Sequence, residues 1–229
     1  MELTVLGKYG PYPKQGGAAS GYLVSDCGEI LLLDMGCGVL SRLLKTVEIT
    51  RLKHIFISHL HYDHTSDLLP FRYLLEESGH TVNVYVHADN SEWCRLLLNH
   101  PNYNVINIDE NTEINIGEIS LSFRKMSHSS EDYAVIVKGG KTLCYTGDTS
   151  YNDNLDYCFA VSDAVLADCS KPESEKSAHM TVCDAKRLAE KYSSVKIFAT
   201  HQSAEYDPAE DLNEYDNIIS VEEMKTYTI

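Results

Sequence analysis

The stretch His59-Leu60-His61-Tyr62-Asp63-His64 follows closely on the apolar triplet Ile55-Phe56-Ile57. Such a triplet is typical of the end of a buried strand. If the chain stays extended beyond it, His59 and His61 project to the same side, because side chains alternate along a strand. If the chain then turns, Asp63 and His64 can face a second metal position nearby. Imidazole and carboxylate groups suit zinc, iron or manganese, so this loop predicts ligands for two metal ions.

Three further residues, two histidines and one aspartate, each follow a predicted strand and lie in a turn of small residues. They are His128, Asp148 and His201, and sites gather where strands end at one rim of a sheet. Because an aspartate can bridge two ions with its two oxygens, we expect Asp148 to be shared. The expected sets are His59, His61, His128 and Asp148 for one ion, and Asp63, His64, Asp148 and His201 for the other. An open position for water is expected between them.

Asp34 ends another strongly apolar run, Ile30-Leu31-Leu32-Leu33. A carboxylate in such a place must find partners or water. Two roles are open from the sequence. Asp34 can brace the metal loop from outside the ligand shell, or it can cap a helix expected over residues 39–46.

Strands and helices are expected to alternate along the chain. Strands are predicted at 3–6, 22–24, 30–33, 82–86, 105–108, 141–145, 164–167, 195–199 and 225–229, with several more between 113 and 138. Helices are predicted at 39–46, 66–77, 90–98 and 181–192, and an acidic turn after residue 149. This order indicates an α/β or α+β fold with two sheets. With neither a repeat nor a linker, we expect one domain over residues 1–229.

Charge and cysteine content limit the partners and the compartment. The net charge of −15 repels nucleic acid at long range, whereas a small anionic substrate responds mainly to the site and its metals. Seven cysteines without a CxxC pair do not indicate a disulfide framework. The start, Met1-Glu2-Leu3-Thr4, lacks signal-peptide features, and no apolar segment approaches the length of a membrane span. We expect a cytoplasmic protein without membrane association, and a homodimer is compatible with the sequence.

The combined pattern resembles the metallo-β-lactamase superfamily. It consists of the HxHxDH run at 59–64, followed in order by His128, Asp148 and His201, with Asp34 upstream. The resemblance spans nearly the whole chain. It implies a four-layer αββα sandwich of two mixed β-sheets flanked by helices, with a dinuclear site at one edge. It also implies two divalent metal ions, first of all zinc, with manganese or iron as alternatives.

Two further turns, at 145–149 and 178–181, resemble the ribonuclease Z-like phosphodiesterase branch of that superfamily. In that branch a histidine in a His-x-Thr turn assists the chemistry, which here is His179. An acidic residue follows the strand after the bridging aspartate, which here is Asp168. The resemblance implies that His179 donates a proton to the leaving alkoxide and that Asp168 orients it. Asp63 would bind a metal and orient the nucleophile, and an ordinary helix-start role for His179 stays open.

The chain departs from the ribonuclease Z pattern in two respects. Position 168 is aspartate where glutamate is usual, and a long insertion is missing. Residues 129–147 alone separate His128 from Asp148, and a predicted hairpin at 133–145 fills them, so the long tRNA-gripping arm of that branch is absent. We therefore expect a small anionic substrate, not tRNA or another nucleic acid. The expected activity is that of a dinuclear metal-dependent hydrolase, a phosphodiesterase acting on a small or cyclic phosphodiester through a hydroxide between the metals.

Three other functions are open. One is a carbonyl-ester hydrolase of the same superfamily, that is a lactonase, thioesterase or β-lactamase. Another is a diiron redox protein, although such relatives usually carry glutamate at the position of His61 and a fused flavin domain. The last is a metal-binding module without catalysis.

Overall fold

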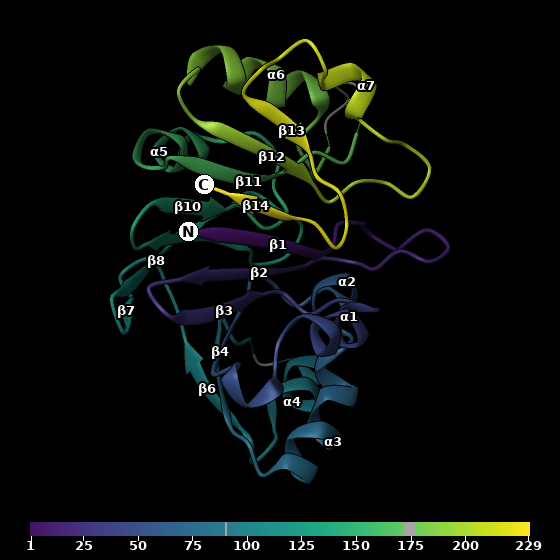
Figure 1. Cartoon of the computed structure of the whole chain (residues 1–229), viewed down its shortest axis with the longest axis vertical. Coiled ribbons are helices and arrows are strands. Elements are labelled where there is room, and N and C mark those ends of the chain that lie inside the picture. The colour runs from purple at the N-terminus through teal and green to yellow at the C-terminus, as the bar shows by residue number, and fades with distance from the viewer. Residues whose placement is uncertain (90, 172–176) are drawn as a thin grey trace.

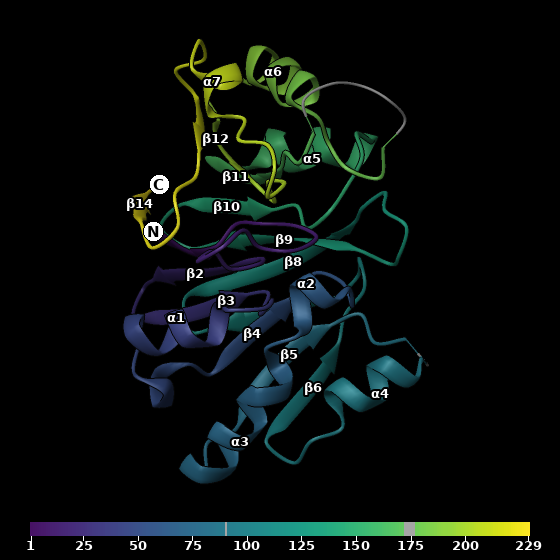
Figure 2. The same cartoon turned by 90° about the vertical axis from the view of Figure 1, so that its right-hand side faces the viewer.

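Two mixed β-sheets face each other in the computed structural model, which describes residues 1–89, 91–171 and 177–229 (Figures 1 and 2). The first sheet has the strand order β14-β1-β2-β3-β4-β5-β6. Its strands are β1 (Glu2–Gly7), β2 (Gly21–Asp26), β3 (Glu29–Leu33), β4 (His54–Ile57), β5 (Val82–Val86), β6 (Tyr103–Asn107) and β14 (Thr226–Thr228). From β3 to β6 the strands run parallel, whereas the other neighbours in this sheet are antiparallel.

The second sheet has the order β13-β12-β11-β10-β9-β8-β7. Its strands are β7 (Glu113–Ile116), β8 (Ile119–Lys125), β9 (Tyr133–Lys138), β10 (Thr142–Tyr145), β11 (Ala164–Asp168), β12 (Lys196–Thr200) and β13 (Ile218–Ser220). From β10 to β13 the strands are parallel, and from β7 to β10 they are antiparallel. The predicted hairpin between His128 and Asp148 is therefore present as β9 and β10.

Helices cover the outer face of each sheet (Figures 1 and 2). Beside the first sheet lie α1 (Val39–Thr46), η1 (Ile49–Arg51), α2 (Tyr62–Thr65), α3 (Leu68–Ser78) and α4 (Glu92–Leu98). Beside the second lie α5 (Asp153–Val161), α6 (Val182–Lys191) and α7 (Ala209–Leu212). The four-layer αββα sandwich that the sequence led us to expect is confirmed.

Three apolar layers hold the sandwich together. The inner layer joins the two sheets, and Phe56 of β4 stacks there on Phe123 of β8 with ring centroids 5.7 Å apart. One outer layer packs α1, α3 and α4 on the first sheet, and the other packs α5 and α6 on the second. Because both faces of the central strands are covered, they read as continuous apolar runs in the sequence.

The same edge of the sandwich receives the ends of four strands that precede predicted site residues. Strand β4 leads into the 59–64 stretch, and β8, β10 and β12 precede His128, Asp148 and His201. β8 runs in the same direction as β10, since both are antiparallel to β9. The two sheets therefore deliver the predicted ligands to one rim.

One expected element is wrong. The acidic turn predicted after residue 149 is instead the helix α5. The Asn152 side chain caps it by accepting the Asn154 N–H at 3.0 Å, and two aspartates lie in its first turn, where the helix dipole favours negative charge. The helix predicted over 90–98 is described from Glu92, and Asn90 lies outside the described residues.

Two expectations from composition can be compared with the structure. All seven cysteines are free thiols, as the absence of paired spacing predicted. Among the described residues, no helix combines the length and apolar character needed to span a membrane.

Candidate metal centre

The 59–64 stretch forms a short loop and the first turn of α2. β4 ends at Ile57, and His61 is the N-cap of α2 with extended backbone angles. His59 Nε2 lies 2.9 Å from His61 Nδ1, so the two rings point to the same side, as the alternation of side chains predicted. The α2 turn then places Asp63 and His64, both buried, toward a neighbouring point.

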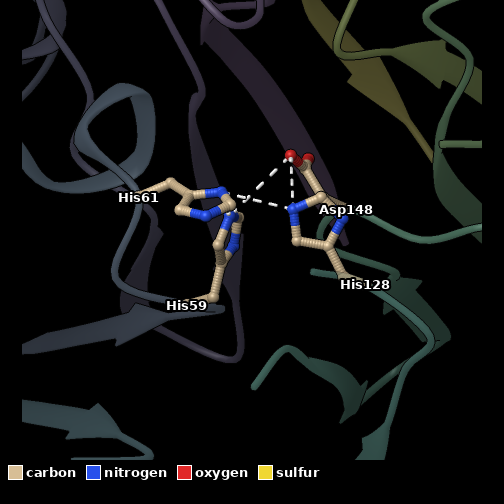
Figure 3. Close-up of side chains that lie close together, drawn as sticks. All are labelled: His59, His61, His128 and Asp148. Carbon is tan, nitrogen blue, oxygen red and sulfur yellow. Dashed lines mark hydrogen bonds and ion pairs between the residues drawn. The ribbon is translucent and has the colours of Figure 1, made fainter. Parts of the chain in front are cut away.

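The first expected set of residues comes together at this rim. Figure 3 shows His59, His61, His128 and Asp148 pointing toward one another. One ligand atom from each lies within 4.8 Å of the others, and His128 Nε2 is 3.2 Å from His61 Nδ1. These residues come from both sheets, so the folded sandwich is needed to assemble the set.

The second expected set lies beside the first and shares Asp148 with it. Asp63, His64, Asp148 and His201 also offer atoms within 4.8 Å of one another. His201 Nε2 lies 3.1 Å from Asp63 Oδ2 and 3.2 Å from Asp148 Oδ2. His201 has a left-handed backbone with φ of 51°. A Cβ on Gly10 would lie 1.9 Å from Nε2 of His201, so only glycine fits against this ring.

Three of the histidines are oriented by partners outside the two sets. His59 Nδ1 lies 2.7 Å from Asp132 Oδ2, His64 Nδ1 lies 2.6 Å from Asp34 Oδ2, and His128 Nδ1 lies 3.0 Å from the Ala178 carbonyl. When each Nδ1–H donates to its partner, each Nε2 keeps a free electron pair that faces the site. That is the tautomer that a metal-binding imidazole needs.

Asp34 braces the metal loop and does not cap α1. Its Oδ1 accepts the Ser58 N–H, and its Oδ2 accepts the Ser58 and Tyr145 hydroxyls and faces His64. The N-cap of α1 is Gly38, without a side-chain bond. Asp34 also has a left-handed backbone with φ of 58°. One buried carboxylate thus links the metal loop of the first sheet to β10 of the second.

Sequence reasoning missed Asp132. It is fully buried, faces His59, and its Oδ2 also accepts the backbone N–H of Asp148 at 3.1 Å. Burial raises the pKa of this carboxyl, and the nearby Asp148 raises it further. Its signal in the sequence is the same as that of Asp34, a carboxylate at the boundary of an apolar strand, here in front of β9.

We expect Asp132→Ala to weaken metal binding by about 10- to 100-fold, the usual cost of losing a partner that orients a ligand. Glu131→Ala is the matched control, because this neighbouring carboxylate is exposed and pairs with Lys125. The measurement is competition with a metal-binding dye. Unchanged affinity in Asp132→Ala would contradict an orienting role for this residue.

The residues present fit divalent metal ions. His64 Nε2 and Asp148 Oδ1 are buried and have no hydrogen-bond partner among the described residues, and they lie 3.3 Å apart. Buried polar atoms normally have partners, so a cation between them would supply one. Burial would raise the pKa of Asp148, but His201 and His64 outweigh it and lower that pKa. A cluster of buried carboxylates needs positive charge nearby.

His179 and Asp168 form a pair at the border of the site. His179 Nδ1 lies 2.8 Å from Asp168 Oδ2 and 3.8 Å from Asp148 Oδ2. The His179 ring stacks on His201, with centroids 5.0 Å apart. Burial alone would lower the pKa of His179, but its hydrogen bond to Asp168 and the charge of that carboxylate raise it. Asp168 also accepts the Thr149 N–H at 3.1 Å, so its orientation is fixed.

The structure thus brings all nine residues expected at the site to one rim. The seven expected ligands form the two sets described above, and Asp168 and His179 adjoin them. These two residues also form a third set within 4.8 Å, together with Asp148 and His201. Because this third set contains His179, a test of its role must measure metal content as well as rate.

Comparisons with known proteins agree with this geometry. Residues 30–202 match the family model described as a beta-lactamase superfamily domain. The chain is 29% identical over 211 residues to the probable metallo-hydrolase YhfI of Bacillus subtilis, covering 88% of this chain and 86% of that protein. The crystal structure of the metallo-β-lactamase fold protein YhfI from Bacillus subtilis has a TM-score of 0.89 to this chain at 25% identity, covering 99% of this chain and 98% of the other.

A ribonuclease Z is also similar in sequence. The mitochondrial ribonuclease Z 2 of Schizosaccharomyces pombe is 24% identical over 229 residues. The match covers 88% of this chain but 34% of that protein, so the present chain corresponds to about a third of this relative.

Proposed function

We propose a specific reaction for this chain, which belongs to the metallo-β-lactamase superfamily and is a metal-dependent hydrolase. The proposed reaction is the hydrolysis of a small or cyclic phosphodiester at a dinuclear centre. The observation that carries the choice of phosphodiester is the pair of His179 and Asp168. An imidazole held by a carboxylate at 2.8 Å beside the two ligand sets is placed to donate a proton to a leaving oxygen.

The ligands proposed for the two ions are His59, His61, His128 and Asp148, and Asp63, His64, Asp148 and His201. All of them offer nitrogen or oxygen atoms, a set that suits zinc first and also manganese or iron. When bound, two such ions would supply a water of lowered pKa and positive charge for the phosphate oxygens.

The chain's own residues would divide the remaining work. Asp63 would hold one ion, since its Oδ2 lies 3.1 Å from His201 Nε2 in the second set, and it would also orient the attacking water. Asp168 would keep Nδ1 of His179 occupied, so that the Nε2–H of the protonated ring points away from this contact and can reach the leaving oxygen. Asp34 and Asp132 would hold His64 and His59 in the tautomer that binds metal.

We also propose that the substrate is small and is not a tRNA. Only the β9–β10 hairpin lies between His128 and Asp148, which leaves no room there for a long RNA-gripping arm. The charge of −15 opposes binding to phosphate backbones at long range. The similarity to a ribonuclease Z makes RNA a necessary competitor in any test.

The test is a substrate panel with the metal-loaded protein and elemental analysis of the same sample. We expect about two zinc-class ions per chain and turnover of small phosphodiesters in preference to lactones, thioesters, β-lactams and a tRNA precursor. Faster turnover of the carbonyl substrates would favour the alternative hydrolase. Efficient processing of the precursor would overturn the small-substrate proposal, and a single ion per chain would overturn the dinuclear one.

A further inference from the structure

A pocket of about 440 Å³ adjoins the metal centre at the first sheet. Two of the proposed ligands, His61 and Asp63, form part of its wall. The rest of the wall includes Leu60, Tyr62 and Trp93, so the pocket is mostly apolar although it borders a highly charged centre. The mechanism described above uses none of these three side chains.

The aromatic part of the wall is held in place. The Trp93 Nε1–H donates to the Leu60 carbonyl at 2.9 Å, which fixes the indole beside the metal loop. The Tyr62 ring meets the indole edge to face, with centroids 4.8 Å apart and planes at 70°. Tyr62 is nevertheless 68% exposed, although most large apolar side chains of this protein are buried. A fixed indole beside an exposed phenol is a surface on which a flat ring can stack.

One side of the pocket is polar. Asp89 and Ser91 line it, and Asp89 Oδ1 accepts the Ser91 N–H at 2.8 Å. That bond orients the Asp89 carboxylate, whose other oxygen can accept an N–H from a ligand. The pocket therefore offers an aromatic wall for stacking and the Asp89 carboxylate as a hydrogen-bond acceptor. Both features suit an uncharged ring with N–H groups, whereas the carboxylate repels a second anionic group.

His179 is not among the residues that line this pocket. In the proposed function His179 protonates the leaving oxygen, so the leaving group lies on its side of the centre. A phosphodiester has one further ester group, which stays on the phosphorus. Because His61 and Asp63 are proposed metal ligands and also line the pocket, the pocket begins beside the metal centre. The retained ester group can therefore extend from the phosphorus into it.

We propose that the pocket formed by Leu60, Tyr62, Asp89 and Trp93 binds a flat aromatic ring in the retained ester group of the substrate. This inference rests on the proposed phosphodiesterase function. It names Trp93 and Tyr62 as residues that determine specificity. The ring is either a nucleobase, whose N–H groups can reach Asp89, or a plain aryl group, and the substrates below distinguish the two.

A binding experiment tests the pocket without turnover. Trp93 is the single tryptophan of the chain, so tryptophan fluorescence reports on this pocket alone. The metal-loaded protein is titrated with thymidine 5′-monophosphate, phenyl phosphate and methyl phosphate. We expect the two phosphates that carry a ring to quench Trp93 and to bind more tightly than methyl phosphate. Equal binding of all three without quenching would overturn the inference.

A kinetic experiment uses three substrates with the same 4-nitrophenolate leaving group, namely the thymidine 5′-, phenyl and methyl 4-nitrophenyl phosphodiesters. The protein should have a higher kcat/KM for the two substrates that carry a ring in the retained ester group, because the 4-nitrophenyl ring is common to all three. Trp93→Ala should reduce kcat/KM on these two by about 10- to 100-fold, the range expected for one stacked ring, and should change the methyl ester little. Trp93→Phe should restore part of the preference, because it keeps an aromatic face.

Two further variants complete the test. Tyr62→Ala should reduce the same preference, and it replaces Trp93→Ala as the test if that variant fails to fold. Tyr73→Ala is the matched control, because this tyrosine is also exposed, at 71%, and lies on α3 outside the pocket. A preference for thymidine over phenyl would identify the ring as a nucleobase, and equal rates would identify a plain aryl group.

The failure modes of the two proposals can be separated. Equal losses on all three substrates in Trp93→Ala would overturn the inference, since Trp93 would then support the site as a whole. If the metal-loaded protein hydrolyses no phosphodiester, the proposed function fails. Quenching of Trp93 by thymidine 5′-monophosphate and phenyl phosphate would still test binding in the pocket.

Discussion

Asp148→Ala is expected to lose most of the bound metal and nearly all hydrolytic activity. Asp148 is the one residue common to the two proposed ligand sets, and its Oδ1 and Oδ2 face His64 and His201 at 3.3 and 3.2 Å. Loss of an orienting partner alone costs about 10- to 100-fold, so loss of a shared ligand should lower activity by about 10³-fold or more. The measurements are metal content per chain after gel filtration and initial rates on a phosphodiester.

The control for this variant is Asp216→Ala, which removes an exposed aspartate. Both variants change the net charge equally, so a difference between them reports on position. Far-ultraviolet circular dichroism should show that both chains fold. If Asp148→Ala retains two ions and full turnover, Asp148 does not bridge the metals and the assignment of both sets has to be revised.

His179→Ala is expected to slow the hydrolysis of a phosphodiester with a poor alkoxide leaving group by about 10²- to 10⁴-fold, the usual contribution of a positioned general acid. An activated 4-nitrophenyl ester should lose much less, because its leaving group needs little help from a proton. Both metals should remain, since His179 is not among the proposed ligands. The measurement is the rate on the two substrates, together with metal analysis.

The matched control for His179→Ala is His87→Ala. The two side chains have similar exposure, 27% for His87 and 23% for His179, and each lies near a carboxylate. Equal losses on the two substrates would point to positioning or phosphate binding by His179 in place of proton donation. Loss of one ion would point to the third ligand set, which contains His179 and Asp168.

The ligands could be expected from the sequence because each one lies in the loop or first helical turn that follows a strand. Strands β4, β10 and β12 are buried on both faces, so the change from apolar to polar residues at the end of each run marks the rim of the sheet. The fold followed from the same runs together with the family pattern. The helix α5 was missed because its first turn is acidic and its cap is an asparagine, a composition also found in turns.

Contacts between distant segments could not be predicted. Asp132 meets His59 only because β9 of the second sheet faces β4 of the first, and no local pattern encodes that distance. The same holds for the stacking pocket. Tyr62 and Trp93 lie in α2 and α4, and their rings meet only because both helices begin at the same edge of the first sheet. Gly10 gave no signal either, since its need for a missing Cβ depends on the position of His201.

The origin of the ligands in both sheets determines when a newly made chain can take up its ions. On the proposed assignment, the first set is complete only once Asp148 has been synthesised, and the second needs His201 as well. The HxHxDH stretch alone offers an incomplete set, because it lacks His128, Asp148 and His201. A metal site also rarely exists before its domain has folded. Uptake of both ions should therefore come late in biosynthesis, after the two sheets have packed together, and a chain that stops before residue 201 cannot hold the full pair.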